Sequence, residues 1–207
     1  MSAARFQVLL VTAALVWSGI GPLDRQIWVM ETLPVVLFGG AMLLLWRRFP
    51  WTALACVLTT LFALILCLGG HYTYEYVPLG NWIRESFGFE RNHYDRIGHF
   101  FQGVTPAILA RELIVRCTPL RPGKALFWIV ASIALAVSAS YELIEWWAAI
   151  ITDPEAGIAF LGSQGDEWDA QWDMALAFGG AIGVQLLFNR LHDRQLATLP
   201  RSPRATG

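Results

Sequence analysis

Residues 164–180 read QGDEWDAQWDMALAFGG, an acidic, tryptophan-rich segment that passes without a break into an apolar run ending in glycines. The apolar character continues to about residue 189. The run therefore reaches the length of about 20 residues that a helix needs to cross the hydrocarbon core of a bilayer. This stretch predicts a membrane helix, at 169–189, whose first turns carry acidic side chains.

Five more apolar runs of similar length precede it, with approximate limits 6–23, 27–46, 50–70, 96–116 and 125–149. With 56% hydrophobic and 15% charged residues and a mean hydropathy of +0.47, the 207-residue chain has more apolar side chain than a small water-soluble domain buries. We predict an all-α fold, a polytopic membrane protein with six transmembrane helices. Residues 1–196 form one membrane-embedded domain in this prediction, and 197–207 form a disordered tail.

Basic residues predict the orientation of these helices. All but four of the fifteen lysines and arginines fall in the terminal segments and loops of one side of the membrane. The four exceptions are Arg25, Arg84, Arg91 and Arg96. Acidic residues divide the opposite way, since only Glu112 and Asp193 lie with the basic majority. We therefore expect both termini in the cytoplasm, and the chain in a bacterial inner membrane surrounded by lipid.

Several classes of protein are disfavoured by what the sequence lacks. No clustered basic face suggests a nucleic-acid partner, and no G-x-S-x-G, H-E-x-x-H or P-loop motif is present. Cys56, Cys67 and Cys117 fall in or beside apolar segments, which predicts packing rather than a disulfide framework or zinc site. The oligomeric state is not predicted by any of these patterns.

Two longer segments lie on the outer side. His71–Tyr94 is rich in aromatic residues, and we expect a short interfacial helix near Asn81–Phe87 and an aromatic belt that includes Tyr74. Ile151–Glu167 contains Pro and Gly and is predicted to be a loop. In the last span, Gly179 and Gly183 form a G-x-x-x-G pattern that predicts close helix packing within the monomer.

Two of the predicted helices each place a pair of ionisable residues near the outer membrane boundary. Asp95 and His99 are four residues apart and therefore share one face of a helix. Glu142 and Glu145 are three apart, and Glu142 lies about 27 Å along a helix from Lys124 on the cytoplasmic side. Both pairs are therefore expected near the same depth.

The last helix adds an acidic stripe, because Asp166, Asp169 and Asp173 lie within about 60° of one another around a helix axis. Helix capping, worth about 0.3–1 kcal/mol, accounts well for the first two. It accounts less well for Asp173, because an acid inside a span costs up to about 3 kcal/mol at mid-bilayer. We therefore favour a polar pocket in which three helices converge, with capping or interface solvation as the alternative.

Such a pocket predicts a site for a divalent metal ion. The predicted metal ligands are Asp166, Asp169, Asp173, Glu142, Glu145 and His71. The predicted catalytic groups are His99, Asp95, Glu142 and Asp173. Carboxylates suit Mg²⁺, Ca²⁺ or Mn²⁺, and histidines move the preference towards Zn²⁺ or Mn²⁺.

Two functions and one structural role remain open from these residues. One is a metal-dependent enzyme that acts on a lipid or cell-envelope headgroup, and another is a non-enzymatic cation or headgroup binder related to transport. The third is a structural membrane subunit. Each of these residues also has a simpler explanation when it is taken singly. His71 and His99 are typical of hydrogen-bonded residues at the membrane interface, and Asp95 is in a position to cap its helix. Glu142 is in a position to pair with Arg91 or Arg96.

Four blocks of the chain resemble the YjdF-type family of bacterial inner-membrane proteins, which is defined by sequence and has no settled activity. They are HYTYEYVP (71–78), RNHYDRIGHFFQG (91–103), ASYELIEWW (139–147) and FLGSQGDEWDAQWDM (160–174). This resemblance implies an inner-membrane location and no particular reaction.

A more remote resemblance, to the VanZ-like superfamily, is carried by Asp95 with His99, by the Glu142 and Glu145 pair, and by Asp169 with Asp173. The chain departs from the VanZ-like pattern at Arg96, Glu145 and Asp173. The resemblance implies at most a link to the cell envelope, and the extra acids favour a cation site.

Overall fold

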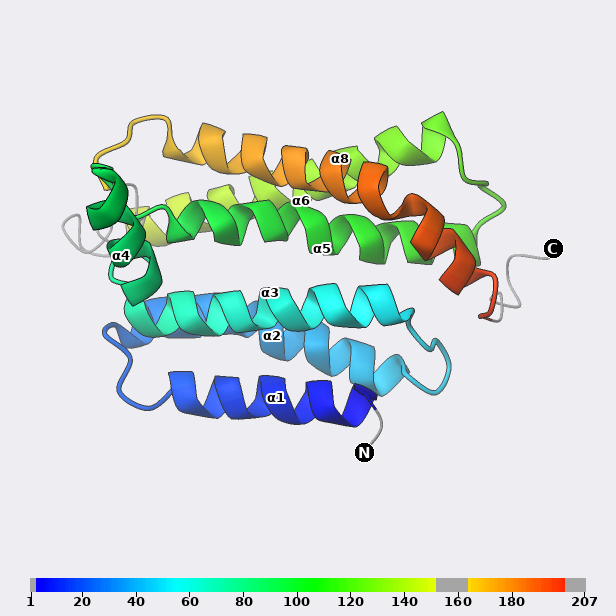
Figure 1. Cartoon of the computed structure of the whole chain (residues 1–207), viewed down its shortest axis with the longest axis horizontal. Coiled ribbons are helices and arrows are strands. Elements are labelled where there is room, and N and C mark those ends of the chain that lie inside the picture. Colours follow the sequence, from blue (N-terminus) through cyan, green and yellow to red (C-terminus); the bar gives the residue numbers. More distant parts are fainter. Residues whose placement is uncertain (1–2, 152–163, 200–207) are drawn as a thin grey trace.

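The computed structural model describes residues 3–151 and 164–199, and the regular elements in these ranges are all helices (Figure 1). The helices are α1 (Ala3–Ser18), α2 (Arg25–Leu45), α3 (Ala53–Tyr72), α4 (Pro78–Phe87), α5 (Tyr94–Cys117), α6 (Lys124–Ile151) and α8 (Asp169–Leu196). The predicted all-α fold is confirmed for the described residues. Most of the predicted 151–167 loop and of the predicted 197–207 tail lies outside them.

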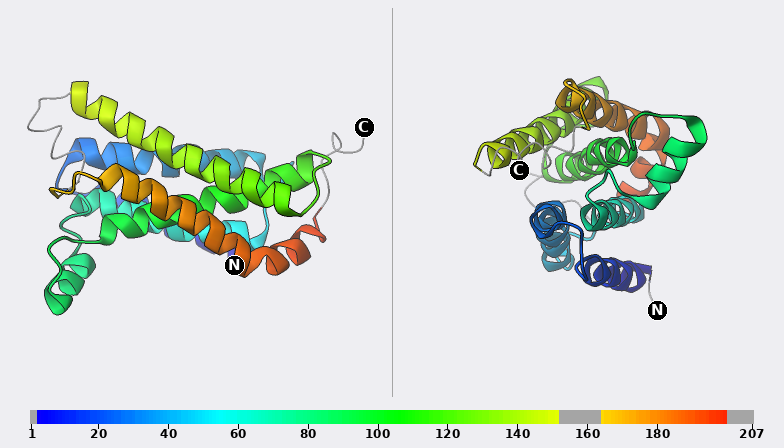
Figure 2. Two further views of the ribbon diagram at one scale, coloured as in Figure 1. Left: turned by 90° about the horizontal axis from the view of Figure 1, so that it is seen from above. Right: turned by 90° about the vertical axis from the view of Figure 1, so that its left-hand side faces the viewer.

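The helices form two groups, and the main contact between the groups is that of α3 with α5. Helices α1 and α2 pack against α3, while α5, α6 and α8 pack against one another, and α3 meets α5. Viewed end-on, α5 lies between α3 on one side and α6 and α8 on the other (Figure 2). The long helices run side by side and α4 lies across one end, which we call the α4 end (Figure 1).

Helix α1 begins and α8 ends at the opposite end of the bundle, which we call the terminal end (Figure 1). Any even number of crossings would place the start of α1 and the end of α8 on one side of the membrane, and that the number is six stays a prediction. Which side the terminal end faces stays a prediction from the distribution of basic residues.

Four of the described helices, α2, α3, α6 and α8, are long and apolar enough to cross a membrane. Helix α1 has 16 residues and is about 24 Å long, and α5 is too polar to qualify. The polarity of α5 has a structural reason, because this helix lies at the centre of its group and buries Arg111, Glu112 and Gln102 against neighbouring helices. That α1 and α5 also cross the membrane stays a prediction.

The apolar residues on the outside of the bundle fit a lipid environment. Leu44, Leu187 and Ile151 are almost fully exposed, and many other large apolar side chains on α1, α2, α6 and α8 are also exposed. An exposed apolar surface of this extent would favour association in water, whereas lipid tails solvate it.

Local signals explain where the helices begin and end. Asp24 caps α2 by accepting hydrogen bonds from the backbone N–H groups of Gln26 and Ile27. Helix α4 begins at Pro78 and ends before Gly88, whose φ of +69° suits a glycine. The short helix predicted near residues 81–87 is thereby confirmed, with its start three residues earlier.

Two glycines allow α5 and α8 to approach closely. A Cβ atom on Gly103 would overlap the backbone of Ala177, and one on Gly180 would overlap the backbone oxygen of Phe100. Gly179 and Gly183 have open space where a Cβ would lie. The predicted close packing at Gly179 and Gly183 is therefore wrong, because the side of α8 that meets α5 is the one bearing Gly180.

A buried polar cluster holds the terminal end together. The Glu112 carboxylate accepts hydrogen bonds from the Thr52 hydroxyl at 2.7 Å and from Arg116 at 2.9 Å. Arg111 donates to Nδ1 of His192 at 3.1 Å, so His192 must carry its proton on Nε2, which points to Glu112 at 3.4 Å. The cluster links the start of α3 to α5 and α8.

An apolar layer separates this cluster from the α4 end. It consists of Val104, Ala107 and Ile108 from α5 with Ala181 and Val184 from α8, all buried in one core. Ionisable side chains of α5 and α8 therefore form two groups, one toward each end of the bundle.

Candidate functional site

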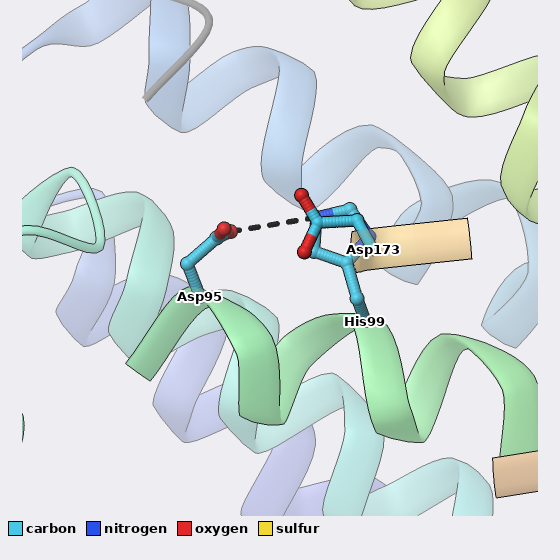
Figure 3. A group of neighbouring side chains, drawn as sticks. All are labelled: Asp95, His99 and Asp173. Atoms are coloured by element: carbon cyan, nitrogen blue, oxygen red, sulfur yellow. Dashed lines mark ion pairs between the residues drawn. The ribbon is translucent and has the colours of Figure 1, made fainter. Parts of the chain in front are cut away.

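Three of the predicted site residues meet near the α4 end. Asp95 and His99 extend from one face of α5 toward Asp173 of α8, and each offers a potential metal-ligand atom, all within 4.8 Å of one another (Figure 3). His99 Nε2 lies 3.4 Å from Asp95 Oδ1 and 3.7 Å from Asp173 Oδ2. The i, i+4 spacing on α5 and the second-turn position on α8 produce this convergence.

The other ring nitrogen of His99 faces a different pair of side chains. Nδ1 lies 2.9 Å from Gln102 Oε1 and 3.6 Å from Glu142 Oε1. Both ring nitrogens thus face oxygen acceptors, Gln102 and Glu142 at Nδ1 and the two aspartates at Nε2, so a cation bound at Nε2 would take the place of a proton there. Glu142 therefore lies behind the imidazole ring rather than beside the two aspartates.

Two carboxylate oxygens in this region are buried without a hydrogen-bond partner. They are Oδ1 of Asp173 and Oε1 of Glu142, and Asp173 is only 2% exposed. A buried carboxylate oxygen normally accepts a hydrogen bond or coordinates a cation, because leaving it unpaired costs free energy. Asp173 therefore has an acceptor that the described residues leave unsatisfied.

A layer of arginine and aspartate covers the cluster on the side of the α4 end. Arg91 pairs with Asp169 at 2.5 Å, and Arg96 pairs with Asp166 at 2.8 Å. The expectation that Glu142 pairs with one of these arginines is wrong, because both reach across to α8 and its preceding turn. Asp166 also accepts from the backbone N–H of Trp168 at 3.0 Å, which closes the turn before α8, but no side chain caps the helix itself.

A further acidic residue, Glu31 of α2, lies near the cluster, and no sequence pattern had indicated it. Glu31 is buried and accepts hydrogen bonds from Tyr74 at 2.6 Å and from Tyr141 of α6 at 3.0 Å. Burial, followed by the charge of Glu31, raises the pKa of Tyr74 well above its usual value, so its hydroxyl stays protonated and donates. Tyr74 thus points inward rather than joining an aromatic belt.

The ring of Tyr74 fits between two glycines. A Cβ on Gly69 would overlap the ring, and one on Gly98 would lie 3.2 Å from it. Tyr74 itself has a φ of +54°. The left-handed turn after α3 and the two glycines together direct the hydroxyl toward Glu31.

Five of the six predicted metal ligands lie outside the three-residue cluster, which includes only Asp173 of that set. His71 donates from Nδ1 to the backbone oxygen of Ser18 at 2.9 Å and stacks on Trp17, so it joins α3 to α1. Glu145 is half-buried on α6 and close enough to Glu142 and His99 to interact with their charges. Asp166 and Asp169 are occupied by the two arginines, as described above.

These observations define a helical integral membrane protein with an aspartate and imidazole cluster near one end of its helices. The chain belongs to the family described as "Predicted membrane protein (DUF2238)", whose model matches residues 3–194. It is 46% identical over 188 residues to inner membrane protein YjdF of Escherichia coli (strain K12). The match covers 91% of this chain and 90% of that protein.

The resemblance to the YjdF-type family is therefore confirmed, and the chain is an inner-membrane protein. No solved structure matches the chain. The remoter VanZ-like resemblance stays a prediction.

Proposed function

We propose that Asp95, His99 and Asp173 bind one divalent cation, and that the protein is a metal-dependent enzyme for a lipid or cell-envelope substrate. The observation that carries the proposal is the meeting of three potential ligand atoms within 4.8 Å, with Asp173 Oδ1 buried and unpaired beside them. A bound cation would satisfy that oxygen and offset the two aspartate charges.

The distribution of charge supports a cation at this position. Arg91 and Arg96 are engaged with Asp169 and Asp166, and the only described ion pair from an arginine to the cluster is a long one, 3.7 Å from Arg91 to Asp95. Asp95, Asp173 and Glu142 thus surround a single imidazole. Buried acids of one sign destabilise a fold unless protons or a cation compensate them.

The position of His99 also supports the proposal. Metal-bound histidines usually donate their second ring N–H to an oxygen acceptor, which fixes the ring and its tautomer. Gln102 and Glu142 provide such acceptors on the Nδ1 side. We assign these two residues to positioning His99, and the mixed carboxylate and imidazole set favours Mn²⁺ or Zn²⁺.

A lipid or envelope headgroup is the substrate class that the depth of the site favours. Asp95 lies in the first turn of α5 and Asp173 in the second turn of α8, so both are close to helix ends, where headgroups lie. A bound cation would supply Lewis-acid polarisation of a phosphoryl or carbonyl oxygen and activation of water. Arg96, still partly exposed, is placed to contact an anionic group that approaches from the α4 end.

The competing function is cation or headgroup binding without chemistry. Transport is less well supported, because Val104, Ala107 and Ile108 form an apolar layer beyond the cluster and Gly103 and Gly180 bring α5 and α8 into close contact. A purely structural role would leave the buried Asp173 oxygen unexplained.

The proposal is tested by metal content followed by product analysis. Wild-type protein loaded with Mn²⁺ or Zn²⁺ and dialysed should retain about one ion per chain, whereas Asp95→Asn and Asp173→Asn should retain none. Asp166→Asn is the matched control, since this acid lies on the same wall but pairs with Arg96. Loaded protein in vesicles of inner-membrane lipids should then generate a new lipid species that Asp173→Asn does not. Metal retention without any product would favour the binder over the enzyme.

A further inference from the structure

An open pocket of about 280 Å³ lies at the terminal end, away from the Asp95 cluster. It lies where the start of α6 meets α5 and the later turns of α8. Its polar lining includes Arg111, Lys124, Gln185 and Asn189, and its apolar lining includes Leu126 and Phe127. None of these residues takes part in the proposed cation site, so this pocket requires an explanation of its own.

The pocket contains fixed positive charge. Arg111 is only 3% exposed, and its guanidinium is held by Asp193 at 2.6 Å and by His192 at 3.1 Å. Lys124 is exposed at the first position of α6, whose first turn has no acidic residue. The free N–H groups of a helix start add partial positive charge. The ionisable side chains that line the pocket, Arg111, Lys124 and Asp193, leave an excess of positive charge.

A second observation comes from two amide side chains in the same wall. Gln185 is 1% exposed, and its Nε2 donates to the backbone oxygens of Phe127 and Ala181, which leaves Oε1 without a partner. Asn189 Oδ1 is also buried without a partner. Both oxygens are acceptors on side chains that line the pocket, and a small rotation of either side chain would turn an unsatisfied acceptor toward an occupant. An occupant that fits would combine an anionic group with hydrogen-bond donors.

We propose that this pocket binds the headgroup of an anionic phospholipid that carries hydroxyl groups. The phosphate lies at Lys124 and the start of α6, within the field of Arg111, and headgroup hydroxyls donate to Gln185 Oε1 and Asn189 Oδ1. Leu126 and Phe127 provide apolar contact for the glycerol and the first acyl carbons. Basic pockets between membrane helices at the boundary bind anionic headgroups by the same combination of charges and contacts.

The chemistry distinguishes this ligand from two related ones. Phosphatidylethanolamine has a phosphate and an ammonium donor but no net charge, so it gains less from the positive excess. Inorganic phosphate has negative charge and P–OH groups, but it lacks the glycerol and acyl carbons that would contact Leu126 and Phe127. Phosphatidylglycerol has a net negative charge, hydroxyl donors and acyl chains, and it is therefore the probe of choice.

The test is native mass spectrometry of the full chain, delipidated in detergent and then titrated with phosphatidylglycerol, phosphatidylethanolamine or inorganic phosphate. Wild-type protein should retain one phosphatidylglycerol at low excess and bind phosphatidylethanolamine about tenfold more weakly. Lys124→Gln and Gln185→Leu should each weaken phosphatidylglycerol binding about tenfold. Arg121→Gln is the matched control, because Arg121 is basic and exposed in the neighbouring loop but does not line the pocket.

Lys124 is exposed, so its variant keeps the fold even if Gln185→Leu does not. Three results would each overturn the proposal: phosphatidylethanolamine binding as tightly as phosphatidylglycerol, Arg121→Gln weakening binding as much as Lys124→Gln, or Lys124→Gln binding like wild type. Full competition of inorganic phosphate with the lipid would also overturn the proposal, because the pocket would then be a site for free phosphate.

Discussion

Oδ2 of Asp173 lies 3.7 Å from Nε2 of His99, and Oδ1 of the same carboxylate is buried without a hydrogen-bond partner. One oxygen of Asp173 thus faces the imidazole, and the other has no hydrogen-bond partner among the described residues. Together with Asp95, these atoms are oxygen and nitrogen donors within 4.8 Å of one another, and the proposed cation site rests on this arrangement.

The first prediction concerns the response of stability to metal. A chelator should lower the melting temperature of wild-type protein in detergent and should leave Asp173→Asn unchanged. At a free cation concentration of 100 times Kd, the loss corresponds to about 2.7 kcal/mol. Asp166→Asn should respond to the chelator as wild type does. Equal chelator responses in wild type and Asp173→Asn would contradict the assignment of Asp173 as a ligand.

A second prediction separates the positioning of His99 from its coordination. Gln102→Leu removes the oxygen that lies 2.9 Å from Nδ1, so it should weaken cation affinity about 10- to 100-fold. Gln102→Glu keeps an acceptor at the same place and should bind at least as tightly as wild type. Isothermal titration with Mn²⁺ measures both. Equal weakening by the two variants would show that Gln102 acts only through packing.

A third prediction tests the contact between α5 and α8. Gly180→Ala places a methyl group against the Phe100 backbone and should cost about 1–3 kcal/mol of unfolding free energy. Gly179→Ala, one residue earlier, has open space and should be close to neutral. Thermal unfolding in one detergent compares them. A larger loss for Gly179→Ala would mean that α8 meets α5 by a different face.

The fourth prediction concerns the Glu112 cluster. Glu112→Ala leaves Arg116 and the hydroxyl of Thr52 without their shared acceptor in a buried site, which should cost about 3–5 kcal/mol. The exposed Glu85 provides a control, and Glu85→Ala should change stability by less than about 0.5 kcal/mol. Chemical unfolding measures the difference. A stability of Glu112→Ala close to that of wild type would show that the cluster contributes little to the fold.

Part of the site could be predicted because helical periodicity is a local property. The spacing of Asp95 and His99, and the depth of Asp173 in its helix, were sufficient to bring these three residues together. Capping, which explained Asp166 and Asp169 from the sequence, is not what these residues do, because Asp166 closes the turn before α8 and Asp169 pairs with Arg91.

What sequence could not predict is which helix faces which. Glu31 reaches Tyr74 and Tyr141 only because α2 and α6 lie near the end of α3, and no local pattern encodes that proximity. The same limit explains why the sequence pattern assigned the close helix contact to Gly179 and not to Gly180. Adjacent residues differ by about 100° around the helix, and only the position of the neighbouring helix decides which of the two lies in the contact. His71 looked like a ligand by type, whereas its place beside α1 makes it a contact for Ser18.

The most direct test of the cation site is X-ray absorption spectroscopy of the zinc-loaded protein. We predict one Zn²⁺ per chain with a first shell of oxygen and nitrogen at about 2.0–2.2 Å, including the signature of one imidazole. His99→Gln should lose that signature, and His71→Gln should keep it. A wild-type spectrum without imidazole, or one that only His71→Gln alters, would contradict the site at Asp95, His99 and Asp173.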